Sequence, residues 1–202
     1  KEKQVRDSIL LRRGGVTIGI VGMNTEDTPE VVAPGNLKDP DTGKNVTISA
    51  STRGVQRAID GVRARGAEVV IVLAHQGWSM NVDGRPKGRL LQVARNLRGA
   101  DIVYGGHTHQ EYMSYVRDTF VAQVPNSGFE YSRTQVCVDT RAGRVVGADT
   151  EPVTVANMAG IAPDPVVQEL VDGYVEQTRA QLDVRVGVVA DVFPRGGVPP
   201  VE

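Results

Sequence analysis

Three histidines carry the sequence features that could do chemistry. His75 ends the apolar run 69–74, and His107 and His109 follow the apolar run 102–104. The first run is rich in β-branched residues and the second is similarly apolar, which is typical of strands buried on both faces. Neutral imidazole is a common protein ligand for zinc and similar divalent ions. Because every histidine of the chain lies at the end of a predicted core strand, their distribution indicates a metal-binding edge.

Two helix-strand units are expected to bring these histidines together. Residues 51–65 have apolar side chains at helical spacing, and residues 90–97 repeat that pattern ahead of the second strand. Short links between consecutive units predict neighbouring strands, so His75 and His107 are expected at the same edge of one sheet. No carboxylate adjoins the histidines in the sequence. The spacing therefore predicts a metal site but does not specify a reaction.

The remaining segments complete an α/β pattern. Residues 5–12 and 16–23 predict a hairpin, and residues 24–46 are rich in turn formers and predict a long irregular surface loop. Successive β-runs between residues 112 and 155 imply antiparallel pairing. Asp164 and Pro165 open a clear helix that is expected to end near residue 182. Asp101 is expected at a strand start with a structural role.

The composition excludes several classes of function. The 202 residues are 40% apolar with a net charge of -1, so no broad positive surface suggests a nucleic-acid polymer as partner. No apolar run is long enough to span a membrane. The single cysteine, Cys137, excludes an internal disulfide and any multi-cysteine metal site, and it is expected to be a small buried thiol on a strand.

Residues 71–77 and 101–109, which carry the three histidines, resemble the second half of the calcineurin-like metallophosphoesterase domain in its 5'-nucleotidase branch. Further segments resemble parts of that branch: residues 19–25, 121–128 and 164–182. The resemblance implies an α/β fold that is part of a four-layer α-β-β-α metallophosphoesterase sandwich. It places residues 1–160 in the C-terminal portion of the catalytic domain. Residues 161–202 would then be the linking helix and the start of the connection to a further C-terminal domain.

The same resemblance implies an activity and a site. The complete protein would be a metal-dependent phosphoester hydrolase of the 5'-nucleotidase type, acting on nucleotides or other small phosphoesters by a metal-activated water. Its cofactors would be two divalent metal ions of the Zn, Mn, Mg or Ca type. His75 and His107 would bind one ion, and His109 would bind the other. The location would be extracytoplasmic, that is periplasmic, cell-wall or secreted.

The chain departs from the family pattern in one respect that limits these expectations. The first half of the family domain supplies an Asp-x-His pair, a bridging Asp and a Gly-Asn-His triplet, and the three histidines of this chain leave none for those positions. We therefore expect an internal segment of a longer enzyme that holds part of the metal site, none of the catalytic residues, and no activity when isolated. The missing N- and C-terminal regions of the same protein would complete it.

Two alternatives remain open at this point. The segment could be a non-catalytic metal-binding fragment or an interaction module, because three neutral ligands without a bridging carboxylate should bind metal weakly. Within the enzymes, the related thiosulfohydrolase branch shares the His-Thr-His turn.

Overall fold

The structure is a computed structural model that describes residues 6–33, 35–49, 51–79, 83–155, 160–188 and 190. The chain divides into two compact units, residues 1–156 and residues 157–202. The first unit is built on a six-stranded mixed sheet with the strand order β1-β2-β3-β4-β6-β5. The strands are β1 (Ser8–Arg13), β2 (Val16–Met23), β3 (Val69–Ala74), β4 (Ile102–Tyr104), β5 (Tyr112–Val116) and β6 (Thr119–Gln123).

The four central strands of this sheet run parallel, and the two edge strands run antiparallel to their neighbours. β2 pairs with β3, β3 with β4 and β4 with β6 in parallel, whereas β1 and β5 form hairpin partners of β2 and β6. The predicted hairpin of the first two strands is therefore confirmed. Because the central strands are parallel, the segments that follow β2, β3, β4 and β6 all leave the sheet at the same edge.

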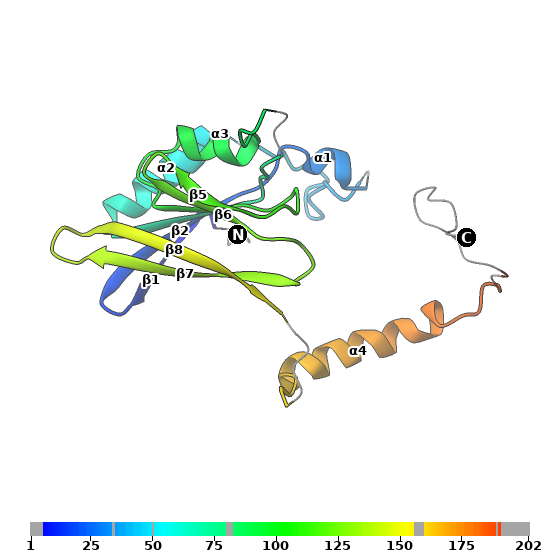
Figure 1. Cartoon of the computed structure of the whole chain (residues 1–202). Coiled ribbons are helices and arrows are strands. Elements are labelled where there is room, and N and C mark those ends of the chain that lie inside the picture. Colours follow the sequence, from blue (N-terminus) through cyan, green and yellow to red (C-terminus); the bar gives the residue numbers. More distant parts are fainter. Residues whose placement is uncertain are drawn as a thin grey trace. The chain divides into compact units, whose positions relative to one another are not determined.

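Two amphipathic helices cover one face of the sheet, as Figure 1 shows. They are α2 (Thr52–Ala64), which precedes β3, and α3 (Arg89–Asn96), which precedes β4. Their apolar sides form one buried core with alternate residues of the strands, including the fully buried Ile59, Leu90 and Val72. A Cβ added at Gly19 would lie 2.7 Å from Val62 Cγ2, so α2 packs closely against β2 because that strand has a glycine there.

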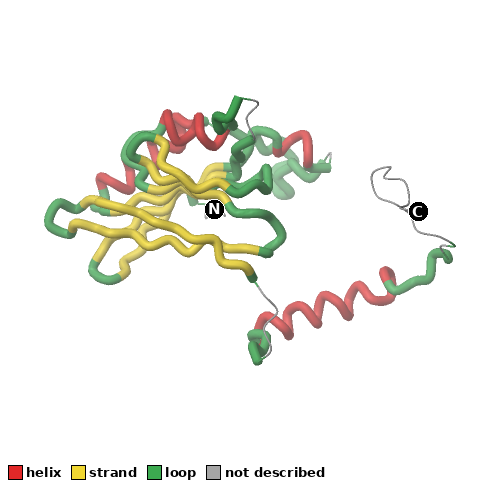
Figure 2. The backbone as a smooth tube through the Cα atoms, in the orientation of Figure 1, coloured by secondary structure: helices red, strands yellow, loops and turns green. Residues whose placement is uncertain are grey.

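The other face of the sheet is covered in part by a two-stranded antiparallel ribbon, labelled β7 and β8 in Figure 1 and lying at the front of Figure 2. It consists of β7 (Glu130–Asp139) and β8 (Arg144–Thr154). Val136 and Ala148 of the ribbon pack against a small cluster on β4 and β6. Because Val136 faces the sheet, Cys137 faces away and is exposed. The prediction of a buried thiol was therefore wrong.

The first unit thus presents three layers within the described residues: helices, the six-stranded sheet and the ribbon. This confirms a mixed α/β fold, while the four-layer sandwich stays a prediction. Considering the described residues alone, this face of the sheet is more open toward β1 and the end of β3, where Leu73 is 49% exposed. The long loop after β2 is not wholly irregular, because it contains a short helix, α1 (Thr28–Val31).

The second unit contains the helix α4 (Pro165–Leu182), as the sequence predicts. The Asp164 carboxylate caps it by accepting hydrogen bonds from the backbone N–H groups of Val166 and Val167, at 2.9 and 3.2 Å. Within the described residues, no helix is long and apolar enough to cross a membrane. The last part of the predicted connection, residues 191–202, lies outside the described residues.

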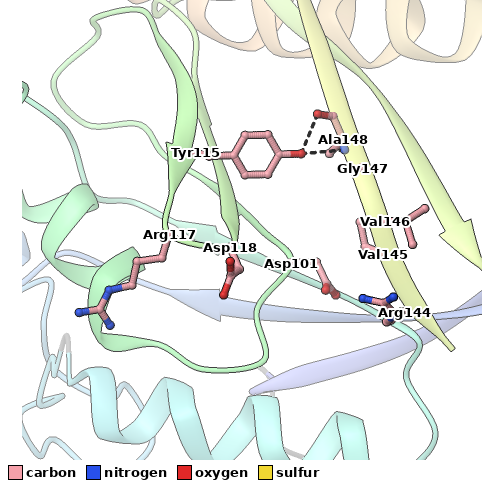
Figure 3. A pocket seen from close by; sticks show the side chains of 9 residues that line it. All are labelled: Asp101, Tyr115, Arg117, Asp118, Arg144, Val145, Val146, Gly147 and Ala148. Carbon is pink, nitrogen blue, oxygen red and sulfur yellow. Dashed lines mark hydrogen bonds between the residues drawn. The ribbon is translucent and has the colours of Figure 1, made fainter. Parts of the chain in front are cut away.

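Asp101 ties the elements of the first unit together just before β4. Its Oδ2 accepts a hydrogen bond from the buried Val70 N–H at 2.7 Å and forms a 2.6 Å ion pair with Arg63 at the end of α2. The expected structural role of Asp101 is therefore confirmed. Asp101 and Asp118 line a cavity of about 490 Å³ between the β5–β6 turn and β8. Figure 3 shows the side chains around it. This cavity lies at the start of β4, whereas His107 follows the end of that strand.

The substitution Asp101→Asn should lower the free energy of unfolding by about 1–3 kcal/mol, because the ionised acceptor shared by Val70 and Arg63 is lost in a partly buried setting. Urea unfolding followed by circular dichroism measures this change. Asp118→Asn, in the turn between β5 and β6, makes the same chemical change and should stay within about 0.5 kcal/mol of the unsubstituted chain. Equal losses for the two variants would contradict the role assigned to Asp101.

Candidate metal centre

His75 and His107 meet at the carboxyl edge of the sheet, as the sequence predicts. His75 directly follows β3 and His107 comes three residues after β4, the parallel neighbour of β3. His75 Nε2 lies 3.3 Å from His107 Nδ1, and the two rings cross at 69° with their centroids 5.1 Å apart. Two ring nitrogens from adjacent strands therefore point toward one another.

The backbone of the histidine turn adopts an uncommon conformation. His107 has a φ of 71° and His109 a φ of 59°, both in the left-handed region. The Thr108 N–H donates to the Gly106 carbonyl at 2.8 Å, which closes a γ-turn with His107 at its centre. A γ-turn with positive φ at its central residue is the rare and strained form. Strain of this kind persists only where the surroundings over-determine the conformation, and it concentrates at functional sites.

Hydrogen bonds join the two histidine loops. The Gly106 N–H donates to the Gln76 carbonyl at 2.9 Å, directly beyond the ends of β3 and β4. The Thr108 hydroxyl donates to the Trp78 carbonyl at 2.6 Å and accepts from Gln123 Nε2 at 3.1 Å. Gln123 is 2% exposed at the end of β6, and its side chain also accepts from the Trp78 N–H at 3.4 Å. One buried amide thus holds both loops.

Glycines allow this close approach. A Cβ added at Gly77 would collide with the Thr108 side chain, and one at Gly105 would collide with Leu90 and come within 2.9 Å of the Gln76 carbonyl. Such distances lie well inside normal van der Waals contact. Each glycine is therefore needed because another segment occupies the space where a side chain would stand.

A carboxylate that the sequence interpretation missed also reaches the site. Asp27 Oδ2 lies 3.1 Å from His107 Nε2, with the side chains of Asp27 and His107 47% and 30% exposed. The expectation that no carboxylate stands beside the histidines is therefore wrong for the folded structure. It is correct only for their neighbours in the sequence. A signal was present, because the run 16–23 is a strand parallel to β3 and the loop that follows it must leave at the same edge.

Glu26, the neighbour of Asp27, is anchored by Gln76 and Arg89. Gln76, which is 2% exposed, donates through Nε2 to Glu26 Oε2 at 2.9 Å and to the Asn24 carbonyl at 3.0 Å. Arg89, at the start of α3, forms a 3.0 Å ion pair with Glu26. Burial raises the pKa of the Glu26 carboxyl, but hydrogen bonds from its own backbone and from Gln76, together with the charge of Arg89, lower the pKa below its ordinary value.

His109 takes a different place from the other two histidines. Its side chain is exposed, and it makes no side-chain hydrogen bond or ion pair within the part of the chain that the structure describes. The structure therefore brings His75 and His107 together and leaves His109 separate. The assignment of His109 to a second metal ion stays a prediction.

The paired nitrogens fit two ligands of one cation. Two nitrogen ligands at about 2.0–2.1 Å from a tetrahedral ion stand about 3.3 to 3.4 Å apart, which matches the separation of His75 Nε2 and His107 Nδ1. The same separation suits an N–H···N hydrogen bond in the absence of metal. Among the described residues, no group of three or more His, Cys, Asp or Glu side chains converges as a metal site. The described residues thus bring together one pair of possible ligands, His75 and His107.

Comparison with known proteins gives relatives of low identity. No protein-family model matches the chain. It is 26% identical to the trifunctional nucleotide phosphoesterase protein YfkN of Bacillus subtilis, over 77% of this chain and 10% of the relative. It is 28% identical to the 5'-nucleotidase of Rattus norvegicus, over 50% of this chain and 14% of the relative. A cell wall protein of Listeria monocytogenes, Lmo0130, is 23% identical over 90% of this chain and 24% of its own length.

The fold has a similar counterpart among solved structures. A putative 5'-nucleotidase from Staphylococcus aureus superposes with a TM-score of 0.61 at 18% identity, covering 84% of this chain and 33% of that one. The present chain spans a quarter or less of the length of each of the three relatives above. At low identity, over half to most of its length, the chain is similar to proteins of the calcineurin-like phosphoesterase and 5'-nucleotidase family.

Proposed function

We propose that the complete protein is a metal-dependent phosphoester hydrolase of the 5'-nucleotidase type, and that this chain supplies one side of its metal site. The observation that carries the proposal is the 3.3 Å approach of His75 Nε2 to His107 Nδ1 at the carboxyl ends of adjacent parallel strands. Ligand sites in open α/β sheets collect at those ends. The family relationship supplies the reaction class and the substrate class, nucleotides or other small phosphoesters.

The chain's own part in this chemistry is to hold ligands in place. His75 and His107 would bind one divalent ion, and two such ions are typical of the family. A bound pair of ions would orient the phosphoryl group and stabilise charge on the attacking and leaving oxygens. The hydrogen bonds from Gly106 to Gln76 and from Gln123 to Thr108 hold the two histidine loops through contacts within the chain itself. His109 is proposed as a ligand of the second ion.

The proposed location is extracytoplasmic. The similarity to a cell wall protein of Listeria monocytogenes supports it. The remaining ligands and the substrate pocket are assigned to regions of the complete protein outside these 202 residues, since the relatives are several times longer than the chain.

The complete protein, purified from its natural source and loaded with Zn²⁺ or Mn²⁺, should release phosphate from nucleoside 5'-monophosphates. The rate should fall to background on treatment with a chelator and return when metal is restored, because the ions supply the nucleophile and the charge stabilisation. Phosphate release from a panel of nucleotides and aryl phosphates measures this. A complete protein that shows no metal-dependent turnover on any phosphoester of the panel would refute the proposal. A natural product near 21.7 kDa would favour the non-catalytic alternative.

The isolated chain should bind Zn²⁺ through His75 and His107 together. With three histidines in the chain, the imidazole nitrogens can be assigned in ¹⁵N nuclear magnetic resonance spectra by single His→Asn variants. Titration with Zn²⁺ should shift the His75 and His107 signals with one midpoint, because both nitrogens face the same ion. His75→Asn should remove the His107 response, whereas His109→Asn should leave the pair unchanged. A His107 response that survives the loss of His75 would contradict a shared ion.

Gly77→Ala should separate the two ligands, because the new Cβ collides with Thr108 and must displace the histidine turn. We expect Zn²⁺ binding at the pair to weaken by about tenfold or more, and the free energy of unfolding to fall by about 1–3 kcal/mol through overpacking. Gly61→Ala is the matched control, since Gly61 lies within α2 and a Cβ there meets no atom within 4 Å. That variant should bind Zn²⁺ normally and gain stability. Unchanged Zn²⁺ binding in Gly77→Ala would show that the loops need no close contact.

A further inference from the structure

We propose that Asp27 is a positioning residue of the metal centre, which holds His107 in the tautomer whose Nδ1 lone pair faces His75. The inference rests on the proposed function, because it concerns a ligand of the proposed metal ion. It extends that function by assigning a role to a residue far from the histidine motif in the sequence.

The assignment follows from what each group can donate and accept. An ionised carboxylate only accepts hydrogen bonds, and a neutral imidazole has one N–H donor and one lone-pair acceptor. With Asp27 Oδ2 at 3.1 Å from His107 Nε2, the proton of neutral His107 belongs on Nε2. Nδ1 is then the bare nitrogen, and it is the one that lies 3.3 Å from His75 Nε2. A metal ligand needs that bare nitrogen.

Asp27 acts through His107 and does not share its ion. The two ring nitrogens point to different sides of the imidazole, so a group that contacts Nε2 stands away from an ion held by Nδ1. Histidines that bind metals usually donate their other N–H to a carboxylate, a carbonyl or a water, which fixes the ring orientation and strengthens the ligand. The Asp27 contact has that arrangement.

The loop after β2 is built to place this carboxylate. Thr25 is 3% exposed; its Oγ1 accepts from the Asp27 N–H at 3.3 Å and its carbonyl accepts from the Thr28 hydroxyl at 2.8 Å. Glu26 is held by Gln76 and Arg89 at 2.9 and 3.0 Å. With Thr25 and Glu26 held by these contacts, the backbone keeps Asp27 beside His107.

The test uses the ¹⁵N-labelled 202-residue chain without metal and then with Zn²⁺. In the metal-free chain, the His107 spectrum should show a protonated Nε2, with its N–H proton directly observed, and an unprotonated Nδ1. Asp27→Ala should abolish the observed Nε2–H proton and populate both tautomers. It should also weaken Zn²⁺ binding at the His75–His107 pair by about 10- to 100-fold.

Two further variants separate this role from a general effect of charge or folding. Asp27→Asn keeps an acceptor oxygen and should fall between the unsubstituted chain and Asp27→Ala in both measurements. Glu30→Gln removes an exposed carboxylate from the same short helix region and should change neither the His107 tautomer nor the Zn²⁺ affinity. The backbone amide spectrum of each variant monitors the fold.

The possible results distinguish this inference from the proposed function. Retention of the His107 Nε2–H proton and of full Zn²⁺ affinity in Asp27→Ala would overturn the role of Asp27. If Zn²⁺ does not shift the His75 and His107 signals of the unsubstituted chain, that result would count against the metal site. The metal-free spectra would still report whether Asp27 sets the tautomer of His107. Equal effects of Glu30→Gln and Asp27→Ala on the tautomer and on Zn²⁺ affinity would show that only the net charge matters. That result would overturn the positioning role of Asp27.

Discussion

The site depends on the parallel pairing of β3 and β4, which continues beyond both strands as the hydrogen bond from the Gly106 N–H to the Gln76 carbonyl. This bond brings the two histidine loops into contact where ordinary strand ends would separate. The absence of side chains at Gly77 and Gly105 lets the loops approach, and the buried Gln123 amide fixes them. The 3.3 Å separation of the ring nitrogens is a consequence of this local packing.

The sequence predicts the parts of this arrangement that follow from periodicity and connection rules. The helical spacing in residues 51–65 and 90–97, followed by apolar strands, was sufficient to place His75 and His107 at one edge, because short helix-strand links force neighbouring parallel strands. The structural role of Asp101 was also predictable, since a carboxylate at a strand start faces unpaired N–H groups.

Other features could not be predicted because they depend on contacts between distant segments. Asp27 is 80 residues away from His107, and its contact requires both the strand order and the hydrogen bonds of Thr25. Cys137 lies on a strand as expected. Which face of β7 contacts the sheet depends on how the ribbon packs, and in the structure it is the face that carries Val136. The positive φ of His107 could not be predicted from the sequence, because the neighbouring glycines are enough to account for a turn there.

The left-handed conformation of His107 links the fold to the proposed chemistry. A residue that is strained in this way relaxes unless contacts with its neighbours hold it in place. Three sets of contacts hold His107. Thr108 is held by Trp78 and Gln123, the preceding backbone is held by Gln76, and the ring itself is held by Asp27. Because all of these contacts are made by the chain's own atoms, the conformational cost of ordering the ligand pair would be met during folding. Metal binding at such a preorganised pair would need less reorganisation than binding at two free histidines.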